Sequence, residues 1–246
     1  MIINIIFFIF FVYLGACIGS FLTMATHRLP NREEIVFKRS HCPKCGRELQ
    51  KKSLIPIVSY LLQKGRCLEC GEKINPRYFI IELINTFSYI LIFLIFGACP
   101  TTFYLCFLFS LLLMITIIDL EHYEIPEYTQ ILLGFFAILH ILFNPIDPLY
   151  ALFCALMYFA IIELVRIITE KIKKREVLGG GDTKLITICG FFLGIKVVGI
   201  FLFTAGVFGV IFSVIWKLLK KTEVFPFAPA IVMSLFILII KYYMAQ

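Results

Sequence analysis

Charged side chains are scarce in this 246-residue chain, where Asp, Glu, Lys and Arg make up only 16% of the residues. Hydrophobic residues make up 61%, and the mean hydropathy is +0.95. A soluble domain does not have this composition, because its surface requires many more polar groups. The scarcity of charge therefore excludes a soluble globular protein and indicates a membrane protein with several spans.

Other features are absent as well. No separate basic tail is present, so nucleic acid is not an expected partner. The net charge of +7 resides mostly in loops beside apolar runs, which favours anionic membrane lipid as the neighbour. Residues 2–24 lack the basic start and small-residue cleavage site of a signal peptide, so we expect a retained first helix. No glycine-rich cofactor loop follows a strand.

Eight apolar runs have lengths that suit membrane helices. They cover residues 2–24, 78–98, 101–118, 125–143, 149–168, 183–195, 197–216 and 225–243. Most approach the roughly 20 residues that a helix needs to cross about 30 Å of hydrocarbon. The shortest, residues 183–195, would extend only about 20 Å, so it is either a short tilted crossing or a re-entrant segment. We predict an all-α polytopic membrane protein with about eight transmembrane helices.

Basic residues give this protein a predicted orientation. If the N-terminus lies outside and all eight runs cross, the inside segments are residues 27–77, 119–125, 169–182 and 217–224. These segments and their flanks hold 21 of the 23 Lys and Arg residues, and the outside half holds only Lys196 and Lys241. The positive-inside rule therefore predicts that the segments face the cytoplasm.

The inside segment 27–77 contains two C-x2-C pairs, Cys42 with Cys45 and Cys67 with Cys70. A piece of about 50 residues is too small to bury a large core and needs a cross-link. Four thiolates in two such pairs can bind Zn²⁺ tetrahedrally. Two disulfides are the alternative, which a reducing compartment disfavours. We expect a small cytoplasmic zinc-ribbon-like domain between the first and second transmembrane helices.

Two aspartates lie at the predicted inner boundary of the membrane. Asp119 directly follows an apolar run and opens an acidic segment that ends at Glu127, while Asp182 lies in the GGGDTK sequence of residues 179–184. An ionisable side chain at this depth is costly and indicates a functional site. The glycines let another segment approach closely. A glycine-rich turn before a helix is also typical of a helix cap or a phosphate site.

The predicted topology places Asp119 and Asp182 at the same membrane face, where they can meet. Two adjacent carboxyl groups share a proton, so one can act as a base and the other as an acid. Such a pair can activate a water molecule against an amide carbonyl, which is aspartyl protease chemistry. No Ser/His/Asp or Cys/His arrangement competes, because the four histidines lack matching nucleophiles.

These motifs resemble those of the type IV prepilin peptidases, a family of bacterial leader peptidases, over almost the whole chain. Residues 179–184 match the GxGDxK motif, whose GxGD part is shared with presenilin-like proteases. Residues 118–121 and 125–127 are similar to the first aspartate motif, and residues 19–22 and 27–30 to the N-terminal signature. The cysteine pairs match the zinc-bearing domain of bifunctional members.

The resemblance implies a multi-pass protein of the bacterial cytoplasmic membrane with Asp119 and Asp182 as catalytic residues. Its expected substrates are type IV prepilins or pseudopilins, whose basic leader is removed after a glycine and before a usually aromatic residue. N-methylation of the new N-terminus from S-adenosylmethionine would follow. We expect a first helix over residues 1–26, a zinc domain over 27–77 and a seven-helix peptidase domain over 78–246.

Two other hypotheses use the same residues. A proton-coupled transporter could use the aspartates as a relay, although such sites usually lie near the membrane midplane between repeated halves. The cysteine domain could be a non-catalytic docking module for the pilus machinery.

Overall fold

A computed structural model describes residues 2–35, 37, 39–174, 178–220 and 225–245. Three basic residues that support the predicted orientation, Lys38, Arg175 and Lys221, lie outside these ranges. The chain divides into two compact units, Met1–Met114 and Ile115–Gln246, and each is described by itself.

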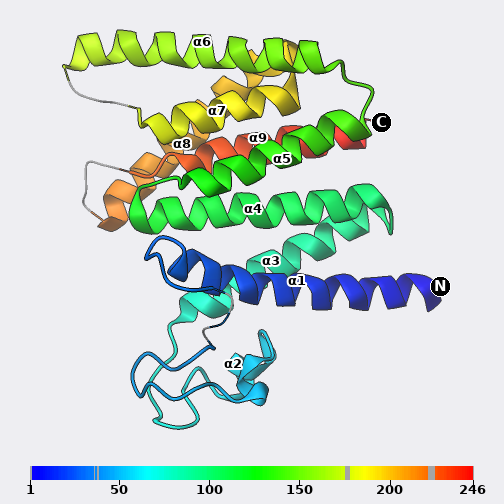
Figure 1. Cartoon of the computed structure of the whole chain (residues 1–246), viewed down its shortest axis with the longest axis vertical. Coiled ribbons are helices and arrows are strands. Elements are labelled where there is room, and N and C mark those ends of the chain that lie inside the picture. The colour runs from blue at the N-terminus through cyan, green and yellow to red at the C-terminus, as the bar shows by residue number, and fades with distance from the viewer. Residues whose placement is uncertain (1, 36, 38, 175–177, 221–224, 246) are drawn as a thin grey trace. The chain divides into compact units, whose positions relative to one another are not determined.

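The described residues form helices and no β-strand. The elements are α1 (Ile2–Arg28), η1 (Lys51–Leu54), α2 (Val58–Leu62), α3 (Pro76–Phe96), α4 (Pro100–His122), α5 (Glu127–Phe143), α6 (Pro148–Lys173), α7 (Gly180–Leu193), η2 (Ile195–Val197), α8 (Val198–Lys220) and α9 (Ala228–Met244). Each of the eight apolar runs corresponds to one helix, which confirms the predicted all-α class (Figure 1).

Five helices among the described residues are long and apolar enough to cross a membrane, namely α1, α3, α4, α6 and α8. The apolar helices α5 and α9 are shorter, at 17 residues each. Helix α7 has 14 residues and ends at Leu193. The next residue, Gly194, has a φ of 70°, which suits glycine. That α7 crosses the membrane therefore remains a prediction.

Helices α3 and α6 begin in the same way. Asn75 and Asp147 each accept a hydrogen bond from the backbone N–H two residues later, at 3.0 Å. A proline, Pro76 or Pro148, follows as the first helical residue. Side-chain caps and a first-turn proline both favour helix initiation, which explains these two boundaries.

In the N-terminal unit, α1 packs closely against α3 (Figure 1). A Cβ added to Gly15 would lie 2.9 Å from the Cα of Thr86, and one added to Gly19 would lie 2.9 Å from the Cα of Glu82. Asn85 donates a hydrogen bond of 2.8 Å to the Gly15 carbonyl. Small residues thus allow the helix backbones to approach, as expected in a membrane.

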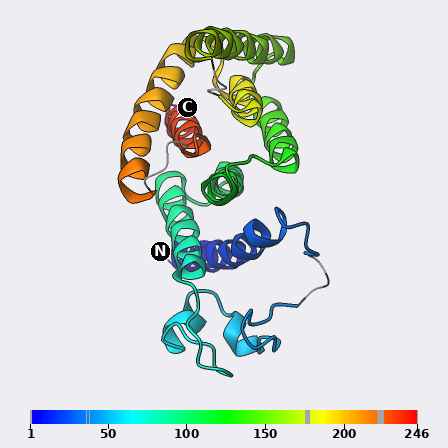
Figure 2. The same ribbon diagram turned by 90° about the vertical axis from the view of Figure 1, so that its left-hand side faces the viewer.

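In the C-terminal unit, α7 packs against α6, α5 and α9, and α8 packs against α9 (Figures 1 and 2). A Cβ added to Gly190 would lie only 2.7 Å from the Cα of Ala155, so α6 and α7 are in backbone contact there. Cys189 and Leu185 are fully buried beside this contact. This packing holds the N-terminal turn of α7, where Asp182 lies.

Candidate active site and metal centre

Asp119 lies in the last turn of α4 and is only 5% exposed. Its Oδ2 atom accepts a hydrogen bond of 2.9 Å from the backbone N–H of Ala228. Ala228 is the first residue of α9, and a helix N-terminus stabilises a negative charge. Asp119 is therefore a buried carboxyl group whose ionised form has a fixed donor.

Asp182 lies in the first turn of α7 and is partly buried. The glycines before it let this turn lie close to the segment that follows α4. A Cβ added to Gly181 would lie 3.3 Å from the Cβ of Ile125, and one added to Gly179 would lie 3.4 Å from Asp182 Oδ2. The glycine-rich sequence thus provides space for neighbouring atoms, as predicted.

The structure brings Asp119 and Asp182 together in the C-terminal unit, close enough for their charges to interact. Two neighbouring carboxylates repel each other, and such a pair can share one proton. One carboxyl group is then a proton acceptor and the other a proton donor. That is the combination needed to activate water and protonate an oxygen.

An exposed ion pair joins the two aspartate motifs. Lys184 Nζ lies 2.8 Å from Glu127 Oε1, with the two side chains 59% and 80% exposed, respectively. The sequence analysis did not pair these residues. Glu121 and Glu124 are exposed, so the acidic segment presents several carboxylates at the surface.

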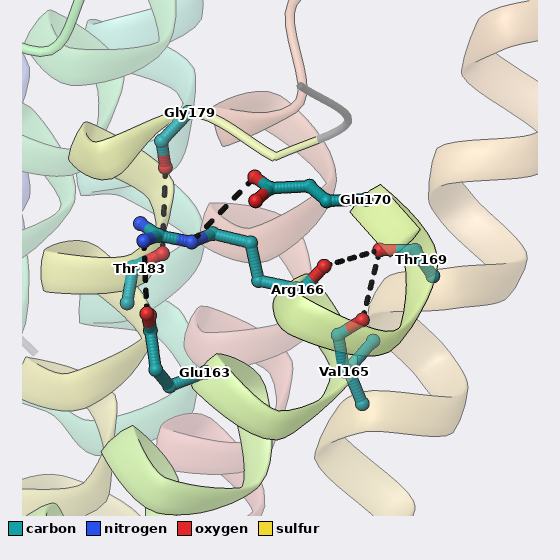
Figure 3. Close-up of polar contacts among 7 residues, drawn as sticks. All are labelled: Glu163, Val165, Arg166, Thr169, Glu170, Gly179 and Thr183. Atoms are coloured by element: carbon teal, nitrogen blue, oxygen red, sulfur yellow. Dashed lines mark hydrogen bonds and ion pairs between the residues drawn. The ribbon is translucent and has the colours of Figure 1, made fainter. Parts of the chain in front are cut away.

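A second polar group lies near the start of α7, on the C-terminal part of α6. Arg166 forms ion pairs with Glu163 at 2.8 Å and with Glu170 at 3.7 Å. Figure 3 shows the Arg166 side chain extending from α6 towards the turn formed by Gly179 and Thr183. Glu163 and Arg166 are three residues apart and so lie on one face of α6, which explains this pair.

The start of α9 is a part of the site that the sequence analysis missed. Ala228 donates to Asp119, and the ring of Phe227 fills the space beside Gly209, where an added Cβ would lie 2.6 Å from Phe227 Cε2. The available signal was Pro226 and Pro229, two prolines among the first residues of the apolar run 225–243. Proline favours a helix start, and a helix start presents free N–H groups.

The four predicted ligand cysteines of the N-terminal unit also come together. The Sγ atoms of Cys42, Cys45, Cys67 and Cys70 all lie within 4.8 Å of one another. The Cys42 and Cys70 sulfurs are 3.9 Å apart. Four thiolates around Zn²⁺ at about 2.3 Å would be separated by roughly 3.8 Å, whereas a disulfide is about 2.05 Å long. The spacing therefore fits a metal ion.

The two cysteine pairs form matching turns. Cys42 N–H bonds to Arg47 O at 2.9 Å, and Cys67 N–H bonds to Glu72 O at 2.8 Å. Gly46 and Gly71 close the turns with φ values of 69° and 71°. These angles explain the glycine after each second cysteine.

Two backbone N–H groups form hydrogen bonds with the sulfur of Cys42. The N–H groups of Cys45 and Lys44 lower the pKa of Cys42 to about 7. A thiol with a lowered pKa more readily supplies the thiolate that binds metal. Arg47 also pairs with Glu69 at 2.6 Å, which joins the first turn to the second.

Models of two protein families match parts of this chain. Residues 13–96 match the bacterial peptidase A24 N-terminal domain, and residues 106–214 match the type IV leader peptidase family. No solved structure matches the chain.

Similar proteins carry the name prepilin leader peptidase/N-methyltransferase. The protein of Bacillus subtilis is 34% identical over 91% of this chain and 89% of its own length. The protein of Neisseria gonorrhoeae is 28% identical over 90% of this chain and 86% of its own length. The protein of Pseudomonas aeruginosa is 28% identical over 89% of this chain and 84% of its own length. This chain belongs to the type IV leader peptidase family.

Proposed function

We propose that the chain is a membrane aspartyl endopeptidase that removes the basic leader of type IV prepilins or pseudopilins and then N-methylates the new N-terminus. Family membership supports the activity, and the names of the relatives contain both reactions. The observation that carries the mechanism is the pairing of Asp119 with Asp182. We assign catalysis to these two residues.

In this mechanism, ionised Asp119 takes a proton from a water molecule, whose oxygen attacks the carbonyl carbon of the scissile peptide bond. Protonated Asp182 donates its proton to the carbonyl oxygen. Collapse of the tetrahedral intermediate breaks the C–N bond, and the nitrogen leaves with a proton from Asp119 while the oxygen returns its proton to Asp182. The products are a leader with a new carboxyl group and a protein with a free amine. The N–H of Ala228 supports the assignment of Asp119 as base.

The surface near the site suits a positively charged leader. Glu121 near the end of α4, Glu124 in the connecting segment and Glu127 at the start of α5 are all exposed. Complementary charge increases the rate at which a basic peptide reaches such a surface. The apolar part of the substrate would remain in the membrane, which places the peptide bond near its boundary.

The orientation and the metal are parts of the same proposal. We assign the N-terminus to the outside and both sites to the cytoplasmic side, because basic residues are concentrated in the corresponding loops. We assign Zn²⁺ to the four cysteines, since tetrahedral thiolate sites prefer it. Methylation takes its methyl group from S-adenosylmethionine.

Mass spectrometry of a processed substrate tests this function. The purified full chain in lipid nanodiscs is incubated with a prepilin-like protein and S-adenosylmethionine. We expect loss of the leader at one bond and a mass increase of one methyl group on the new N-terminus. An intact substrate would contradict the peptidase assignment, and a cleaved but unmethylated product would contradict the methyltransferase assignment.

A further inference from the structure

The segment between the two cysteine pairs, residues 51–66, presents an apolar surface. Within this inter-pair segment, which includes η1 and α2, five large apolar side chains are 46–77% exposed: Leu54, Ile55, Val58, Leu61 and Leu62. Three of them occupy positions i, i+3 and i+4 of α2, so they share one face of that helix. Exposed apolar side chains gathered in this way usually mark a contact surface.

The opposite side of the inter-pair segment is attached to the first turns of α3. The ring of Tyr60 stacks on the ring of Phe79, with centroids 4.8 Å apart and an interplanar angle of 15°. The Ile57 N–H donates a hydrogen bond of 2.7 Å to Glu82 Oε2. The segment is therefore fixed to α3 on one side, while its five apolar side chains remain largely exposed on the other.

Helix α3 sets the depth of this attachment in the membrane. It has 21 residues and is long and apolar enough to cross. At 1.5 Å per residue it extends about 32 Å, close to the roughly 30 Å of hydrocarbon, so its first residue lies near one boundary. Phe79 and Glu82 are then about 5 and 9 Å along the helix from Pro76. Segments that lie in a membrane interface bury their apolar side chains to a similar depth of about 5–10 Å.

The inter-pair segment carries charge of one sign only. Its charged side chains are basic and exposed, two before the apolar residues and two after them: Lys51, Lys52, Lys64 and Arg66. Within the described residues, none of the four forms an ion pair. Basic residues beside an exposed apolar face are typical of segments that bind anionic lipid.

We propose that the inter-pair segment inserts its apolar side chains into the membrane at the start of α3 and binds anionic phospholipid headgroups through its four basic side chains. One cysteine pair precedes the segment and the other follows it. The lipid contact therefore holds the cysteine cluster at the membrane surface. The proposal does not depend on either catalytic assignment.

Photochemical labelling of the wild type tests the lipid contact. The full chain is irradiated in nanodiscs of phosphatidylcholine that contain a small fraction of phosphatidylglycerol with a photoreactive acyl chain. Trypsin cleaves after Lys and Arg, so it releases residues 53–64 as one peptide and residues 67–73, the second cysteine turn, as another. We expect label on 53–64 and none on 67–73, which contains Glu69 and Glu72. An unlabelled 53–64 peptide, the result if a second copy or a substrate covered this face, would overturn the proposal.

A change of headgroup separates the charged contact from the apolar one. The same small fraction of photoreactive phosphatidylcholine replaces the anionic lipid, so that only the headgroup differs. We expect the label on 53–64 to decrease about threefold or more, because the basic side chains no longer concentrate the photoreactive lipid around the segment. Equal labelling by the two lipids would overturn the assignment of the headgroups.

Tryptophan fluorescence measures the depth of the segment. Trp216 is the only tryptophan of the chain, so Trp216→Phe provides a background without one. On this background, Leu62→Trp reports on the inter-pair segment, and Leu68→Trp, at an exposed position of the second cysteine turn, is the matched control.

In nanodiscs with brominated acyl chains, we expect quenching of Leu62→Trp to be at least about twofold stronger than that of Leu68→Trp, because an inserted residue lies among the acyl chains. Equal quenching at the two positions would overturn the proposed insertion. Bound zinc shows whether each variant is folded, and the labelling of the wild type decides the question without any variant.

Discussion

The N-terminal unit forms its polar site mainly from one continuous stretch of chain, whereas the C-terminal unit brings its two carboxyl groups together from helices that are distant in sequence. The four cysteines lie between residues 42 and 70 and form two similar turns. Asp119 and Asp182 are separated by the whole of α5 and α6. The first site should therefore depend on a bound ion, and the second on helix packing.

The largest effect should come from the carboxyl pair. We expect Asp119→Asn and Asp182→Asn each to lower the rate of leader cleavage by about 10²- to 10⁴-fold, since each removes one partner in acid–base catalysis. Both variants should keep their metal and their affinity for S-adenosylmethionine. A cleavage assay with a labelled prepilin-like substrate gives the rates.

The remaining aspartate of the chain provides a matched control. Asp147 is exposed and caps α6, and asparagine is an equally good cap. Asp147→Asn should therefore cleave at the wild-type rate. Near-wild-type cleavage by either of the other two variants would remove the proposed mechanism.

The next effect concerns the cysteine cluster. Cys42→Ser should reduce bound zinc from about one ion per chain to a small fraction, because a tetrahedral site loses one of its four ligands. Leader cleavage should fall less than in the aspartate variants. Elemental analysis measures the bound zinc, and the cleavage assay measures the rate.

Cys99→Ser is the control for this comparison, since Cys99 lies outside the cluster. It should retain its zinc. If Cys42→Ser lost zinc and still cleaved and methylated its substrate at the wild-type rate, a docking role for the cysteine domain would be favoured.

A smaller effect should follow from disturbing the packing of α7. A side chain at Gly190 must displace the backbone of α6, because an added Cβ lies 2.7 Å from Ala155 Cα. We expect Gly190→Leu to lower the free energy of unfolding by about 1–3 kcal/mol and to reduce cleavage by moving Asp182. Thermal unfolding in detergent measures the change in stability, and the cleavage assay measures the change in rate.

Gly206→Leu is the matched substitution, because nothing lies within 4 Å of a Cβ at that glycine. Its unfolding midpoint should stay near that of the wild type or rise. An equal loss of stability in the two variants would show that contact with α6 does not control the result.

The difference between the units also explains what could be predicted from sequence. The four metal ligands follow from spacing alone, since each pair forms its own turn around a glycine such as Gly46. The eight helices follow from apolar length. Asp119 and Asp182 were identified by their unusual depth beside apolar runs, and the predicted topology put them at one face.

Other parts of the sites were not predictable in this way. The donor to Asp119 is a backbone N–H of Ala228, which has no side-chain signal. The hydrogen bond of 2.7 Å from the Ile57 N–H to Glu82 depends on how the segment around Ile57 folds onto α3, with Ile57 at a φ of 63° that no propensity favours. Both contacts form only after helices and loops from different parts of the chain have packed.

The smallest effect should come from the exposed pair between Lys184 and Glu127. Because water screens an exposed pair, such contacts contribute about 0–1 kcal/mol. Lys184→Met and Glu127→Gln should each change the rate of cleavage by less than about fivefold, because 1 kcal/mol of activation free energy corresponds to about that factor. A double-mutant cycle on cleavage and on unfolding should give a coupling energy below about 1 kcal/mol, decreasing at high salt. A larger, salt-independent coupling would mean that the pair fixes the position of the Asp182 turn, and that the C-terminal site, like the cysteine cluster, depends on a local cross-link.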